Sequence, residues 1–131
     1  MATQGLRVFF GAGFLVEAVL GVMPAGFGIA DGVTHISAAF LALALATAHA
    51  MGAARPGFAW FVNAFGLLDI VVVAGGISFV LLPEIGPHHN VMLAAFFAAP
   101  IFIALHFVAI HRIVVGAWRP AAPGRAPALA A

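Results

Sequence analysis

The residues of this chain that could do chemistry are carboxylates and imidazoles that stand inside long apolar stretches of sequence. Ionisable groups in apolar surroundings are costly, so they often mark a ligand site or a path for protons. Asp69 is the most isolated, because aliphatic residues surround it and its nearest polar neighbour before it is Asn63. Such a carboxyl either carries protons or holds helices together through a hydrogen bond. The candidates for proton transport are Glu17, Asp69 and His106.

A second group of candidates centres on Asp31. Asp31 and His35 are four residues apart and therefore share one face of a helix. A polar turn at residues 83–90 is expected on the same side of the fold. Carboxylate and imidazole are ligands of Zn, Cu, Ni and Fe, so the group predicts either a divalent transition-metal site or a simple Asp31–His35 pair beside a solvated turn. The candidate metal ligands are Asp31, His35, Glu84, His88 and His89.

The spacing of the histidines also allows a haem. His35 and His49 are 14 residues apart, about 21 Å along a helix. Met92 and His106 have the same separation, and imidazole and thioether both ligate haem iron. On this interpretation His35, His49, His106 and Met92 hold haem b. The alternative role for His49 is an interfacial side chain that reaches toward water.

The composition indicates the solvent in which these residues lie. Of 131 residues, 65% are hydrophobic and 7% are charged, whereas about 25% is usual for charged residues in a soluble domain. So few charges cannot cover a surface that faces water, so we expect an integral membrane protein. Cysteine is absent, which excludes disulfides and thiolate metal sites. The five arginines are scattered, which argues against a nucleic-acid partner.

Four apolar runs are long enough to cross a bilayer, and clusters of Pro and Gly separate them. We therefore expect one all-α domain over residues 1–119, an integral membrane four-helix bundle packed through Gly and Ala. Residues 120–131 are rich in Pro and Ala and are expected to form a disordered cytoplasmic tail. The expected spans are about 5–23, 28–52, 58–82 and 90–117.

The arginines predict the orientation of the bundle. In a four-span arrangement all five lie on one side, which the positive-inside rule makes cytoplasmic, so both termini are expected inside (N-in/C-in). Arg7 is counted among these interfacial charges. Asp31 is then expected near the outer surface, hydrated and ionised, and Asp69 deeper in its span and desolvated. If Asp69 only joins helices, the isosteric change Asp69→Asn should leave stability nearly unchanged.

A short motif occurs twice in the chain. Residues 27–31 and 65–69 both read Phe-Gly-[Ile/Leu]-x-Asp, on spans expected to run in opposite directions. Inverted repeats of this kind build ligand sites near the midplane of transporters. In a chain dominated by Phe, Gly, Ala and Leu, so short a match also arises by chance.

Three motifs together resemble a group of small four-span bacterial inner-membrane proteins with no named activity. The resemblance implies a multi-pass protein of the bacterial inner membrane and points to Asp31, Asp69 and His106. His35, His49, His88 and His89 lie outside the shared pattern. The motifs are Pro-Ala-Gly-Phe-Gly-x-x-Asp at residues 24–31, Asn-x-Phe-Gly-Leu-Leu-Asp at 63–69 and Pro-Ile-Phe-x-x-Leu-His at 100–106.

The sequence favours a small non-catalytic membrane protein, because no nucleophile with a neighbouring base and no phosphate-binding loop is recognisable. One interpretation is a cofactor-binding protein that uses the metal or haem ligands given above. The alternatives are an accessory subunit of a larger membrane complex, or a small proton-linked transporter that uses Asp69. The expected partners are the lipid bilayer and either further copies of the chain or a larger complex.

Overall fold

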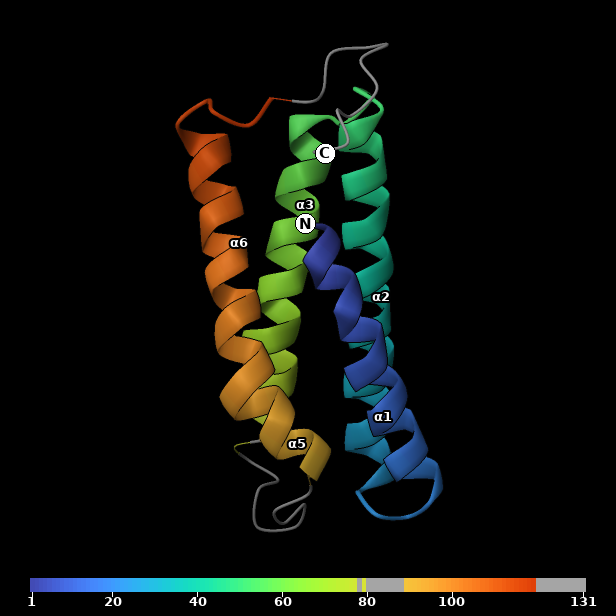
Figure 1. Cartoon of the computed structure of the whole chain (residues 1–131). Coiled ribbons are helices and arrows are strands. Elements are labelled where there is room, and N and C mark those ends of the chain that lie inside the picture. Colours follow the sequence, from blue (N-terminus) through green and yellow to red (C-terminus); the bar gives the residue numbers. More distant parts are fainter. Residues whose placement is uncertain (78, 80–88, 120–131) are drawn as a thin grey trace, which may run out of the picture.

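The computed structural model describes residues 1–77, 79 and 89–119, and these form helices joined by turns (Figure 1). The prediction of an all-α fold is confirmed. The elements form four helical segments in chain order. They are η1 (Ala2–Leu6) with α1 (Arg7–Val19), α2 (Ala25–Ala50), α3 (Pro56–Leu68) with η2 (Asp69–Ile77), and α5 (His89–Leu93) with η3 (Ala94–Ala98) and α6 (Ala99–Val114).

Within the described residues, three helices are long and apolar enough to cross a membrane, namely Ala25–Ala50, Pro56–Gly76 and Val91–Val114. The first segment is shorter and begins with a 3-10 turn, η1. The polar turn expected at residues 83–90 falls largely outside the described residues, and so does the expected tail at 120–131.

Two of the long helices contain π-helical stretches. η2 continues α3 without a break from Asp69, and η3 joins α5 to α6. Isolated π turns often occur at functional sites, because the wider turn changes the direction in which side chains point. Asp69 stands at the junction where α3 becomes η2.

The first two segments run side by side in opposite directions and approach closely through glycine (Figure 1). A Cβ added to Gly11 would lie 2.7 Å from the carbonyl oxygen of Gly32, and one added to Gly32 would lie 2.8 Å from that of Gly11. At Gly11 and Gly32, the expected packing of helices through glycine is therefore confirmed. Through this contact, α1 packs closely against the face of α2 that carries Asp31 and His35.

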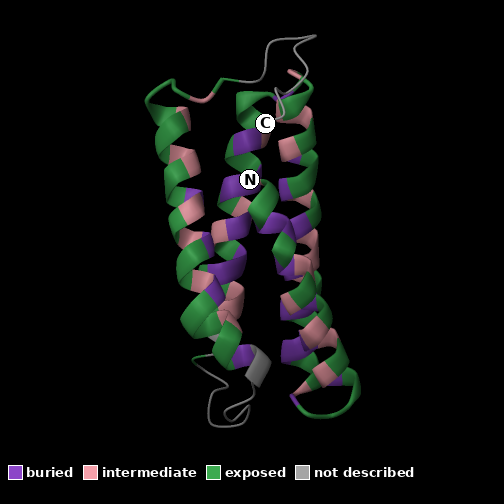
Figure 2. Ribbon diagram, viewed as in Figure 1, coloured by how far each residue is buried: buried purple, intermediate pink, exposed green. Residues whose placement is uncertain are grey.

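Several polar residues are buried and many large apolar residues are exposed. Figure 2 shows how buried and exposed residues are distributed along the helices. Phe9, Val19 and Phe96 are more than 70% exposed, whereas Arg7 and Asp31 are at most 1% exposed. This distribution suits a lipid environment, where apolar side chains form the outer surface and costly polar groups face the interior.

Candidate functional site

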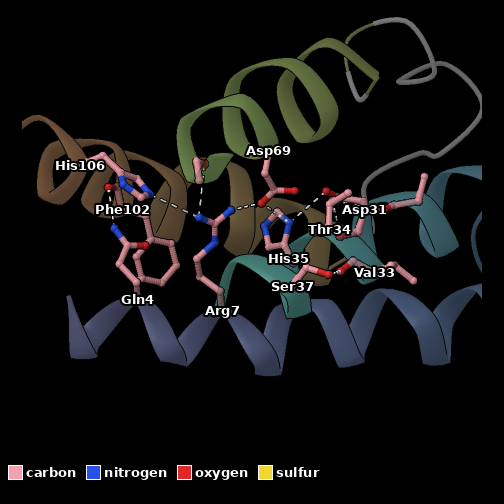
Figure 3. Close-up of polar contacts among 12 residues, drawn as sticks. Gln4, Arg7, Asp31, Val33, Thr34, His35, Ser37, Asp69, Phe102 and His106 are labelled. Atoms are coloured by element: carbon pink, nitrogen blue, oxygen red, sulfur yellow. Dashed lines mark hydrogen bonds and ion pairs between the residues drawn. The ribbon is translucent and has the colours of Figure 1, made fainter. Parts of the chain in front are cut away.

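A cluster of buried polar side chains occupies the interior, with contributions from all four helical segments (Figure 3). Polar side chains in an apolar interior are stable only when they satisfy one another. Within the described part of the chain the buried polar residues are Gln4, Arg7, Asp31, His35, Asn63, Asp69 and His106.

Arg7 lies at the centre of this cluster and is fully buried. Its guanidinium forms an ion pair with the carboxylate of Asp69 and donates a 3.3 Å hydrogen bond to the carbonyl oxygen of Gly66. The guanidinium carbon also lies 5.8 Å from the ring centroid of Phe102. The interpretation of Arg7 as an interfacial charge is therefore wrong, because its side chain points into the protein and Asp69 pairs with it (Figure 3).

The imidazole of His35 joins the two aspartates of the repeated motif. Its Nδ1 lies 3.1 Å from Oδ1 of Asp31 and 3.1 Å from Oδ2 of Asp69. The ring packs edge-on against Phe14, with centroids 5.7 Å apart. Two helices that run in opposite directions thus bring their carboxylates to one nitrogen atom.

His106 forms the other side of the cluster. Its Nδ1 lies 3.0 Å from Oδ1 of Asn63, and the amide of Asn63 donates a 2.7 Å hydrogen bond to the carbonyl oxygen of Ala59. The Asn63 oxygen can only accept, so the network assigns the ring proton to Nδ1 of His106. Nε2 then accepts from Arg7 across 3.4 Å. Both nitrogens of His106 are engaged within the protein.

Asp31 is 1% exposed, so the expectation that it is hydrated is wrong. The reason is the close contact between α1 and α2, which covers this face of α2. Neither carboxylate oxygen of Asp31 accepts a hydrogen bond from the described residues, and the same holds for Oδ1 of Asp69. Among the described residues of the cluster, the unpartnered acceptor oxygens therefore outnumber the unpartnered donor, which is Nε of Arg7.

The charges of the cluster do not balance without an added proton. Arg7 supplies one positive charge, and Asp31 and Asp69 supply two negative charges. A buried net charge is far more costly than a neutral group of partners. One proton on Asp31, His35 or Asp69 makes the whole cluster neutral.

A cavity of about 460 Å³ lies beside the cluster, and Asp31 and His35 form part of its wall. The remaining wall is apolar, and residues of both π-helical stretches contribute to it. Among the residues that line the cavity are Phe10, Phe14, Ala74, Ala95, Phe96 and Phe102.

The structure separates the other predicted site residues from the cluster. His49 packs against Trp118, with ring centroids 5.1 Å apart, at the far end of α2. Met92 is 41% exposed and lines the cavity. The four predicted haem ligands are thus divided, since His35 and His106 contact protein partners within the cluster and the other two lie elsewhere.

The predicted metal ligands are only partly described. Among the described residues, Asp31, His35 and Asp69 each have one potential ligand atom, a carboxylate oxygen or an imidazole nitrogen, and these atoms lie within 4.8 Å of one another. Glu84 and His88 lie outside the described residues, and of His89 only its place at the start of α5 is described. Glu17 is half-buried and is part of neither the cluster nor the cavity wall.

Sequence reasoning missed three members of the cluster as site residues, namely Gln4, Arg7 and Asn63. Gln4 donates a 3.1 Å hydrogen bond to the carbonyl oxygen of Phe102. A signal for Arg7 was present, because it lies inside the first expected span, and an arginine within an apolar run calls for a partner of opposite charge.

Comparison with known proteins gives one family match. The model of the family described as Domain of unknown function (DUF8737) matches residues 1–114. The matched range includes every residue of the cluster. Among the curated proteins and the solved structures, none matches the chain.

Proposed function

The chain belongs to the DUF8737 family, and we propose that it is a small membrane protein whose buried cluster of Asp31, His35 and Asp69 takes up and releases one proton as part of proton-linked transport. The proposal combines a titratable cluster in an apolar interior with a cavity that reaches it. Intramembrane carboxylates and imidazoles commonly form proton relays.

The observation that carries the proposal is the position of Nδ1 of His35 between two carboxylate oxygens, 3.1 Å from each. If this nitrogen carried no proton, three lone-pair atoms would face one another in a buried site. A neutral imidazole can place its own proton on Nδ1, but Arg7 and the two carboxylates then leave the cluster with a net charge of −1. One added proton, on the second ring nitrogen of His35 or on a carboxylate, neutralises it. Because the three groups share it, the proton belongs to the cluster rather than to one residue.

The same three residues fit a divalent metal less well. With the two carboxylates and Arg7, a divalent ion would give the buried cluster a net charge of +1. The guanidinium of Arg7 also pairs with the Asp69 oxygen that lies nearest His35. A single positive charge balances the cluster, so we favour a proton and propose no metal here.

The proposed arrangement has four spans with both termini on the cytoplasmic side. The first segment, η1 with α1, reaches about 30 Å at about 2.0 Å per residue for η1 and 1.5 Å for α1, which matches the thickness of a hydrocarbon core. Arg55 precedes α3, while Arg112 and Arg119 lie in and after the last turn of α6, at the same end of the structure (Figure 1). Without Arg7, these arginines still support the orientation.

The proton on the cluster can be observed by nuclear magnetic resonance of the purified full chain labelled with ¹⁵N-histidine in detergent micelles. We expect the ¹⁵N signals of His35 at neutral pH to show protons on both ring nitrogens, unless infrared spectra place the added proton on an aspartate as a carboxylic acid. His35→Gln removes this signal and identifies it. His111→Gln is the matched control, because His111 is exposed near the end of α6.

The proposal fails if His35 carries a proton on only one ring nitrogen at neutral pH while infrared spectra show both aspartates ionised. Metal analysis of the same preparation tests the alternative. A stoichiometric divalent metal that is lost in His35→Gln and kept in His111→Gln would show that the cluster binds a metal ion instead of a proton.

A further inference from the structure

The cavity beside the cluster combines an aromatic wall with one acidic edge. Its volume of about 460 Å³ lies within the range of pockets that hold small organic ligands. Phe10, Phe14 and Phe102 line it together with Asp31 and His35, and the ring of Phe14 packs edge-on against that of His35. Residues of η2 and η3 also line it, including Ala74 and Ala95.

The polar atoms at the edge of the cavity specify the charge of a ligand. Oδ2 of Asp31 is buried and has no partner among the described residues, so a ligand that reaches it must bring positive charge or a donor. The terminal nitrogens of Arg7 are engaged with Asp69, Gly66 and His106, which leaves only its buried Nε without a partner among the described residues. Arg7 is not one of the described residues that line the cavity, so the cavity offers an anion no arginine.

The charged and titratable groups around Asp31 and His35 come from three directions. Arg7 faces them from α1, Asp69 from the start of η2, and His106 lies behind Arg7 on α6. In α5 and η3 the described side chains include no titratable group. Arg7 contacts Asp69 directly, and its charge also acts on Asp31. Its single charge cannot balance both carboxylates, and Asp31 is the one of the two that lines the cavity.

We propose that the cavity binds a lipophilic monovalent cation, whose charge replaces the proton of the cluster beside Asp31. This inference rests on the proposed function and names the class of its substrate. In the protonated state the cluster is neutral. It stays neutral when one cation enters and one proton leaves, so the exchange avoids a buried net charge. The aromatic rings of the wall add attraction for an organic cation.

The exchange makes a quantitative prediction for binding. Tetraphenylphosphonium, a lipophilic cation with no hydrogen-bond donor, is the probe, titrated calorimetrically into the full chain in micelles. Measurements in two buffers of different ionisation enthalpy count the protons released, and we expect about one per bound cation. In acid, where the proton competes, affinity should fall by about tenfold per pH unit.

Three variants distinguish charge from cavity. Asp31→Asn keeps the shape of the site and removes the negative charge, so affinity should fall by about tenfold or more. Ala95→Phe fills the cavity without changing a charge and should also abolish binding. His111→Gln is the matched control, because His111 is exposed near the end of α6 and does not line the cavity, and binding should be unchanged.

A neutral molecule of similar shape, triphenylphosphine oxide, separates this proposal from a site for any apolar ligand. The proposal is overturned if the neutral molecule binds as well as the cation, if Asp31→Asn binds the cation as tightly as the natural chain, or if no proton is released. If the cluster carries the added proton as expected but the cation does not bind, only the substrate class is wrong. If neither His35 nor an aspartate carries the added proton, the proposed function is wrong.

Discussion

The two copies of the repeated motif place their aspartates against the same nitrogen of His35 but in different electrostatic surroundings. Asp69, at the junction of α3 and η2, has the guanidinium of Arg7 as a second partner. Asp31, on α2, has only His35 among the described residues, and it borders the cavity. The same short motif thus gives one carboxylate in direct contact with a permanent cation and one without that contact among the described residues.

The glycines of the two copies also lie against different kinds of neighbour. Gly28 lies against α1, where an added Cβ would be 2.8 Å from the carbonyl oxygen of Phe14. Gly66 lies against the ring of His106, and its carbonyl oxygen accepts a hydrogen bond from Arg7. The first copy therefore joins two backbones, and the second makes room for polar side chains. A repeated sequence specifies close packing, and the neighbouring helix determines whether that packing serves structure or chemistry.

Among the substitutions that test this comparison, removal of Arg7 should lower the free energy of unfolding most. Arg7→Gln leaves Asp69 and Asp31 buried with no permanent cation, so the free energy of unfolding should fall by about 3–5 kcal/mol. The measurement is denaturant-induced unfolding in micelles. Arg112→Gln, at an exposed arginine of α6, is the control and should change stability by less than about 0.5 kcal/mol. Equal stability of the two variants would show that Arg7 does not compensate the aspartates.

The two aspartates should respond differently to the same isosteric change. Asp69→Asn leaves Arg7 without its ion pair and should cost about 2 kcal/mol, contrary to the neutral outcome expected for Asp69 as a simple joint between helices. Asp31→Asn removes the excess negative charge and should change stability by less than about 1 kcal/mol. The same unfolding assay compares the two variants. Equal losses would remove the distinction between them.

The glycines should give smaller and distinguishable losses. Gly66→Ala and Gly28→Ala should each cost about 1–2 kcal/mol, because the added methyl overlaps a neighbour. His106→Ala should compensate Gly66→Ala, because that overlap is with a side chain, and should leave Gly28→Ala uncompensated. A double-mutant cycle measures this coupling. Purely additive losses at Gly66 and His106 would contradict the observed contact.

Much of the fold could be predicted because its signals are local. Long apolar runs interrupted by Pro and Gly indicate helices and turns without reference to the rest of the chain, and α2 lies within a few residues of its expected range. Asp31, His35, Asp69 and His106 could be singled out because each is ionisable within an apolar run. Whether these four carry the proposed chemistry stays a prediction.

The geometry of the cluster could not be predicted in the same way. The partner of Arg7 is 62 residues away, and their contact depends on which faces of α1 and η2 meet. A single arginine near one end of an apolar run resembles an interfacial anchor until the facing helix is known. The burial of Asp31 likewise depends on the close approach of α1 to α2 rather than on its own neighbours in sequence.

The separation of Arg7 and Asp69 along the chain has a consequence for biogenesis. In the proposed membrane arrangement, the first helix enters the bilayer with a positive charge whose partner is encoded 62 residues later. At about 5–20 residues per second, ribosomes take about 3–12 s to synthesise that interval. For this time the nascent helix carries an uncompensated arginine. Its retention in the membrane therefore depends on the insertion machinery or on interfacial lipid until the third helix arrives.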